Sequence, residues 1–231
     1  MSKVLNKVSY IDNLKKAIAD VADHPYHAGF KMQAHHILSR EAFFRVDGKR
    51  GEFARKVEAI GYNINLAQNL VFLPCELEGA CHLQVPLHRG NHTYVDHNNK
   101  DGDVYRPYHA EVARRIESKI RKFVNDCDTR CATNAYSREQ QIQKMLDSVS
   151  KKVLKLVADY KLPLNRMHTD FKLHNPKGCG NLVNIGTSEQ NCKKNRDHSL
   201  DLQHREHGGT IDFPSVAANQ GKSTYSLRIY E

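Results

Sequence analysis

The sequence predicts an α+β fold in which a small sheet lies among amphipathic helices. Two short apolar segments, at residues 31–39 and 69–74, have the length and composition of buried strands. Longer segments place apolar residues at helical spacing. Beyond Pro163 the chain is rich in Gly, Asn, His and Lys, which predicts a loop-rich C-terminal extension.

The helices are predicted from their apolar stripes and their caps. Residues 10–23 carry such a stripe directly after Ser9, which forms a capping box with Asp12. The other predicted helices span residues 51–60, begin at Pro107, and span residues 137–160. Near the C-terminus, the alternation of Tyr225, Leu227 and Ile229 predicts a short strand.

The chain is long enough to bury a large core. Its 231 residues are 39% hydrophobic and 26% charged, which is typical of a packed globular protein. We predict a first domain at residues 1–126 and a helix followed by a loop-rich extension at residues 127–231.

The charge of the chain favours polyanionic partners. Lys and Arg number 35 against 26 Asp and Glu, a net charge of +9, and such an excess attracts nucleic acid or an acidic protein. The first residues lack the apolar core of a signal peptide, and no segment approaches about twenty uninterrupted apolar residues. We therefore expect no membrane anchoring, and six cysteines that are thiols or metal ligands.

Two adjacent histidines, His35 and His36, lie in the first predicted strand. Successive strand residues point to opposite faces, so the two imidazoles suit different tasks. One can bind a metal ion while the other takes a proton from water. The alternative is that one packs in the core and the other is solvated.

A second pair, His88 and His92, has H-x-x-x-H spacing. On a helix this spacing places both side chains one turn apart on the same face, within reach of one cation. Gly90 between them weakens a helix, and among 14 histidines the spacing can also arise by chance.

The order of these blocks resembles that of the AHH nucleases of the HNH/endonuclease VII superfamily, a group common among bacterial polymorphic toxins. Ala34-His35-His36 resembles the motif that names the family. The segments 61–74 and 87–92 resemble its middle and last blocks, so the resemblance covers about residues 30–115. It implies a ββα-metal (HNH-like) core within a mainly helical domain, with one divalent cation held between the first strand and the helix.

The resemblance also implies a role for each site residue. His35, His88 and His92 are then metal ligands, His36 is the general base, and Asn69 is the central asparagine that braces the loop and orients the base. The reaction implied is hydrolysis of phosphodiester bonds with one divalent ion, which is Mg, Mn, Ni or Zn.

The sequence departs from the family after His92. In the family a Tyr and a Val follow the last histidine closely, whereas here Tyr108 and Val112 come after about a dozen extra residues. This insertion leaves open whether His92 or a residue of 93–109 completes the metal site. The alternatives are His97, His109, Asp96, Asp101 and Asp103.

The expected function is a metal-dependent endonuclease that cleaves DNA, or alternatively RNA, with low sequence specificity. Arg89 and the basic residues of 114–122 are expected to contact phosphates. The family further implies a toxin effector that is made in the cytoplasm, exported by a specialised secretion system and active in the target cell cytoplasm. An acidic immunity protein would protect the producing cell.

Two other functions remain as alternatives. One is a non-catalytic, zinc-stabilised module that binds nucleic acid, and the other is a housekeeping or defence nuclease. In the extension, a structural zinc site could be formed by His174, Cys179, Cys192 and His198.

Overall fold

The computed structural model describes residues 9–27, 29–48, 51–76, 79–80, 83, 85–88, 92, 107–130, 135–165 and 227–229. The elements are α1 (Tyr10–Ala17), β1 (Met32–His36), α2 (Arg40–Arg45), α3 (Glu52–Ala59), the 3-10 turn η1 (Ala67–Asn69), β2 (Leu70–Pro74), α5 (Tyr108–Arg130) and α6 (Ala135–Ala158). The predicted α+β class is confirmed, because helices surround a two-stranded antiparallel sheet as in a ββα-type nuclease core.

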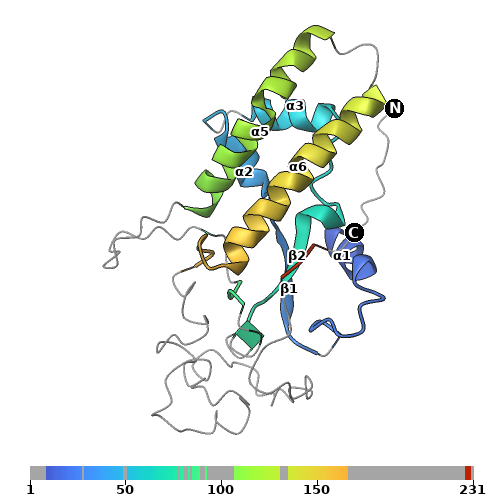
Figure 1. The fold of residues 1–231 in the computed structure, drawn as a ribbon, viewed down its shortest axis with the longest axis vertical. Coiled ribbons are helices and arrows are strands. Elements are labelled where there is room, and N and C mark those ends of the chain that lie inside the picture. Colours follow the sequence, from blue (N-terminus) through green and yellow to red (C-terminus); the bar gives the residue numbers. More distant parts are fainter. Residues whose placement is uncertain are drawn as a thin grey trace, which may run out of the picture.

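The sheet joins the two predicted strands. β1 and β2 are antiparallel, with His35 opposite Val71 and His36 opposite Leu70. Every residue of β2 is buried, whereas in β1 His35 is the one buried residue, Gln33 is exposed and the other three are partly buried. In Figure 1 the long helices α5 and α6 run side by side above the sheet, and α1 lies beside it.

The two faces of β2 pack in different clusters. Leu70 and Phe72 point towards α1, where Leu14 and Ile18 cover them. The other face contributes to the main core, which includes Val71 and Leu73 of β2, Val112, Ile116 and Ile120 of α5, and Ile142, Leu146 and Val153 of α6. Because α6 shares this core with α5, the predicted first domain and the helix after it pack together. The division at residue 126 stays a prediction.

Several helix bounds differ from the prediction. α1 ends at Ala17 rather than at residue 23, because Ile18 caps it and the chain then turns. The short helix α2 was not predicted. Ser39 Oγ caps it by accepting a hydrogen bond from the backbone N–H of Ala42 at 3.2 Å. α5 runs to Arg130, past residue 126, where we predicted the end of the first domain.

The predicted C-terminal strand is not formed at residues 227–229, the part of it that the structure describes. Leu227 and Ile229 instead pack against the main core, so their alternation reflects burial and not pairing with a strand. His174, Cys179, Cys192 and His198 lie outside the described residues. Within the described part of the chain, no helix combines the length and apolar character needed to cross a membrane.

Candidate metal centre and active site

Three histidines meet beside the first turn of α5. His35 comes from β1, while His88 and His92 come from the segment after β2, and their nearest ring nitrogens all lie within 4.8 Å of one another. His35 Nδ1 is 3.2 Å from His88 Nε2, and the centre of the His92 ring is 4.8 Å from that of His35. The backbone N–H of His88 donates to the carbonyl of Pro74 at 2.8 Å, which fixes His88 beside the end of the sheet.

The prediction that His88 and His92 share a helical face is wrong. His88 lies in an irregular segment, and His92 lies in a bend with φ of 54°, a left-handed conformation that is uncommon for a residue with a side chain. The two rings are nevertheless close, with 4.9 Å between their centres.

Burial keeps this histidine triad, His35, His88 and His92, uncharged at neutral pH. Burial lowers the pKa of His88 to about 4. Burial, followed by the charges of His88 and His109, lowers the pKa of His92 to about 3. For His35, which is 1% exposed, burial and then the neighbouring histidines hold the pKa well below its usual value. Neutral imidazoles have the free lone pair that a metal ion requires.

The triad fits a divalent ion that accepts nitrogen ligands. Imidazole nitrogens lie about 2.0–2.1 Å from zinc, so adjacent ligands of one ion are about 3.0–3.4 Å apart. The 3.2 Å between His35 Nδ1 and His88 Nε2 falls in this range. The Nε2 of His92 is buried and has no hydrogen-bond partner among the described residues, as expected for an atom that serves as a ligand.

His36 lies on the opposite face of β1, as the strand alternation predicts. Its Nε2 is 3.0 Å from Asn65 Oδ1, and the ring of Tyr10 packs against it with 4.8 Å between ring centres. An amide oxygen only accepts hydrogen bonds, so the His36 Nε2–H donates to Asn65. The Nδ1 of a neutral His36 then carries the lone pair that can accept a proton.

Asn69 connects three segments through one buried amide. Its Oδ1 accepts from the Leu38 N–H at 2.7 Å and from the Ser150 hydroxyl at 3.1 Å. Its Nδ2 donates to the carbonyls of Leu38 at 3.0 Å and Ile64 at 2.9 Å. These bonds hold the chain that leaves β1 after His36 against the loop before β2, and they tie both to α6.

The comparison with protein families agrees with this geometry. Residues 22–153, more than half of the chain, match AHH, a nuclease family of the HNH/ENDO VII superfamily with conserved AHH. The chain belongs to the AHH nuclease family. No curated protein and no solved structure matches the sequence. Family membership makes the chain an enzyme that hydrolyses phosphodiester bonds in nucleic acid, and HNH-type nucleases use a divalent metal, which the triad could hold.

The structure places some of the alternative ligands in this AHH nuclease. His109 lies next to His92, with 5.5 Å between ring centres, and its Nδ1 is 2.8 Å from Ser39 Oγ. The nitrogens that lie within 4.8 Å of one another belong to His35, His88 and His92. Arg89, Asp96, His97, Asp101 and Asp103 lie outside the described residues.

Sequence reasoning missed residues that contact the site histidines. Tyr108 Oη lies 2.8 Å from His35 Nε2, and Gln33 Oε1 lies 3.1 Å from His88 Nδ1. Gln33 could have been found, because it precedes His35 by two positions and so lies on the same face of the strand.

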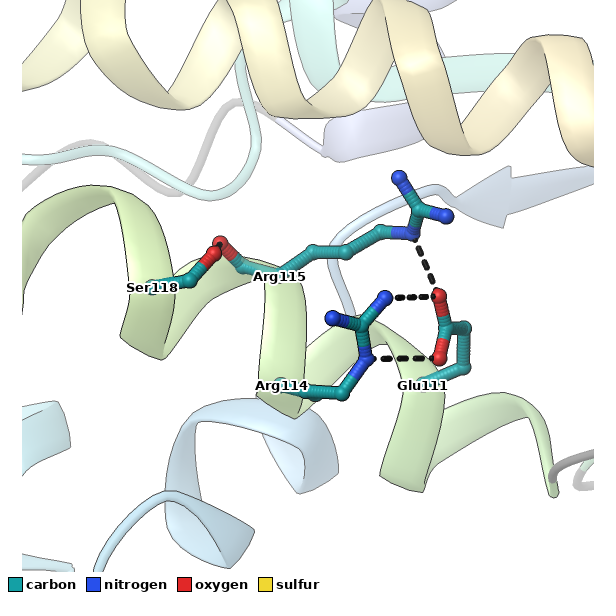
Figure 2. A network of polar contacts seen from close by, with 4 residues as sticks. All are labelled: Glu111, Arg114, Arg115 and Ser118. Carbon is teal, nitrogen blue, oxygen red and sulfur yellow. Dashed lines mark hydrogen bonds and ion pairs between the residues drawn. The ribbon is translucent and has the colours of Figure 1, made fainter.

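The arginines of α5 are organised around Glu111 (Figure 2). Arg114 donates to both carboxylate oxygens, through Nε at 3.0 Å and Nη2 at 2.7 Å, and Arg115 Nε donates to Oε1 at 2.7 Å. Burial acts to raise the pKa of Glu111, but the two arginines outweigh it and hold that pKa below its usual value. In Figure 2 the terminal nitrogens of Arg115 point away from Glu111, which leaves them available to another anion.

Proposed function

We propose that the chain is a metal-dependent endonuclease that cleaves DNA with low sequence specificity. The observation that carries this proposal is the triad of neutral imidazoles, with His35 and His88 buried and His92 partly buried, and with His36 on the other face of the strand that carries His35. Metal binding and proton transfer are thereby assigned to separate histidines whose rings are each fixed by neighbouring side chains.

In this mechanism the triad would hold one divalent ion, which when bound offsets the negative charge on the phosphoryl and leaving oxygens. His36 acts as the general base. Asn65 keeps the proton of His36 on Nε2, so Nδ1 takes the proton of the attacking water. The water oxygen bonds to phosphorus as the bond to the leaving oxygen breaks. Asn69 keeps the backbone beyond His36 in place through both of its bonds to Leu38.

The positive charge of the chain supports a nucleic-acid substrate that is bound through the phosphates of the nucleic acid. The net charge is +9, and Arg115 presents its terminal guanidinium nitrogens away from Glu111. Contacts to phosphates position a duplex without reading its bases, which supports low sequence specificity.

The test is cleavage by protein that has been stripped with EDTA and then loaded with Mg, Mn, Ni or Zn. Supercoiled plasmid and RNA are offered in parallel. We expect the wild type to nick and linearise plasmid, and His36→Ala to be slower by about 10²–10⁴-fold because the general base is lost. His27→Ala is the matched control, since His27 is exposed and its Nε2 contacts the carbonyl of Ile18 instead.

Each other outcome rejects a part of the proposal. Intact plasmid and RNA with every metal would reject the metal-dependent endonuclease. Cleavage of RNA alone would reject DNA as the substrate. Unfolding in EDTA without cleavage in any metal would favour the zinc-stabilised binding module.

We further propose that the nuclease is an antibacterial toxin effector. It would be made in the cytoplasm, exported by a specialised secretion system and active in the cytoplasm of the target cell. The resemblance to toxin-associated nucleases supports this role by analogy, and the net charge of +9 supports an acidic immunity protein as partner. Expression in a bacterial cytoplasm should arrest growth and degrade the nucleoid, whereas His36→Ala should be tolerated. Normal growth with active wild-type enzyme in the lysate would contradict the toxin role.

A further inference from the structure

Tyr108 fixes which nitrogen of His35 carries the proton. The Tyr108 hydroxyl is fully buried at the start of α5 and donates its single proton to the carbonyl of Ile37 at 2.7 Å. The same oxygen is 2.8 Å from His35 Nε2, so it can only accept there, and His35 Nε2–H is the donor. A neutral imidazole carries one such proton. The lone pair of His35 is therefore on Nδ1.

Gln33 fixes the proton of His88 on Nδ1, whereas that of His35 is on Nε2. Its Oε1 lies 3.1 Å from His88 Nδ1, and an amide oxygen only accepts. His88 Nδ1–H is then the donor, and the lone pair of His88 is on Nε2. The two histidines thus present different nitrogens, Nδ1 from His35 and Nε2 from His88.

These two lone pairs face each other. His35 Nδ1 and His88 Nε2 are 3.2 Å apart, and two acceptors at that distance have no hydrogen to share. A cation placed between them removes the repulsion. We propose that Tyr108 and Gln33 are positioning residues, which hold His35 and His88 in the tautomers that a divalent ion requires. This inference rests on the proposed metal dependence, and neither Tyr108 nor Gln33 touches the ion.

The partners differ in how they hold their histidines. Tyr108 is buried, belongs to the core helix α5 and also packs against His92, with 4.9 Å between ring centres. Gln33 is exposed on β1. The tyrosine therefore fixes both the proton and the place of the His35 ring, while the glutamine acts on His88 through one hydrogen bond that can be altered without disturbing the core.

The first test is the affinity of the full chain for Zn or Ni, measured by calorimetry with a competing chelator. Tyr108→Phe keeps the ring and removes the hydroxyl, and we expect it to bind metal about 10–100-fold more weakly, the usual effect of losing an outer partner of a ligand histidine. Tyr62→Phe is the matched control, because Tyr62 is also buried and its hydroxyl has no hydrogen-bond partner among the described residues. Its affinity should stay within about twofold of the wild type.

The second test uses Gln33, whose replacement leaves the core intact. Gln33→Leu removes the acceptor and should weaken metal binding about 10-fold, whereas Gln33→Glu keeps an acceptor and should bind at least as tightly as the wild type. A merely structural role would not produce this split between the two variants.

The third test is a long-range ¹H–¹⁵N spectrum of the histidine rings in the metal-free chain. It should show the proton of His35 on Nε2 and that of His88 on Nδ1, with the His35 preference lost in Tyr108→Phe. A His35 proton on Nδ1, or metal binding by Tyr108→Phe within twofold of the wild type, would overturn the inference and leave the nuclease proposal standing. A wild type that binds no metal would overturn both.

Discussion

Replacing Asn69 by alanine is expected to lower the free energy of unfolding by about 3–5 kcal/mol. The Asn69 side chain is 0% exposed and makes four hydrogen bonds, two to Leu38 and one each to Ile64 and Ser150. A typical bond contributes about 1 kcal/mol net, and buried groups left without a partner cost about 1–3 kcal/mol each. In a chain of this length 1 kcal/mol corresponds to about 2–4 °C, so the Tm should fall by about 6–20 °C.

The assay is urea unfolding followed by circular dichroism, together with a thermal scan, on the metal-free chain. Asn63→Ala is the matched control, because Asn63 is exposed and its Oδ1 accepts one bond, from the Asn65 N–H at 3.0 Å. It should cost less than about 1 kcal/mol. Asn69→Asp keeps both acceptor contacts but places a carboxylate oxygen against the carbonyls of Leu38 and Ile64, so it should also destabilise. If Asn69→Ala and Asn63→Ala unfold at the same urea concentration, the amide does not join these segments as described.

Three further predictions address the charge, the protonation and the backbone of the chain. Arg115→Ala should reduce the slope of log affinity for DNA against log salt by about 1, measured by fluorescence anisotropy, and an unchanged slope would argue against a phosphate contact. Because the pKa of His88 is about 4 when folded and 6.5 is its ordinary value, the unfolded chain binds more protons below pH 6.5. The free energy of unfolding of the metal-free chain should therefore fall as the pH drops from about 6.5 to about 4. This group contributes up to about 1.4 kcal/mol per pH unit. Denaturant titrations that give a constant free energy of unfolding over this range would contradict the prediction. Gly51 has φ of 74°, and an added Cβ would lie 2.5 Å from the Phe44 ring. Gly51→Ala should therefore lower the free energy of unfolding by about 1–3 kcal/mol, measured by a thermal scan. Gly48→Ala should lower it less, because φ is 68° there but no atom lies within 4 Å of an added Cβ.

The strands and their two histidines could be predicted because the signals are local. Strand residues alternate with a period of two, so His35 and His36 had to face opposite sides wherever the strand paired. β2 was marked by a different local signal, the continuous apolar run that ends at Pro74, because a strand buried on both faces has no polar position within it.

The remaining contacts of the site join residues that are far apart in the chain. Tyr108 is 73 positions from His35, and Asn65 is 29 positions from His36, so no local period connects them. The helical interpretation of His88 and His92 was wrong because the spacing of two ligands does not by itself show that they lie on a helix, and neither residue is helical here. α2 has six residues, too few for a periodic pattern, and only the cap at its start marked it.

Ser150 gives the last long helix a part in a centre whose predicted ligands and base all precede it. Its hydroxyl donates to the Asn69 amide from α6, 81 positions further along the chain, and Ile142 and Val153 of the same helix fill the core beside α5. A truncated protein that ended after the histidine motifs would lack the Ser150 donor to the Asn69 amide, and the apolar side of α5 would be exposed to solvent. The smallest folded version of this enzyme therefore has to extend to the end of α6, at Ala158, and cannot end at the last histidine motif.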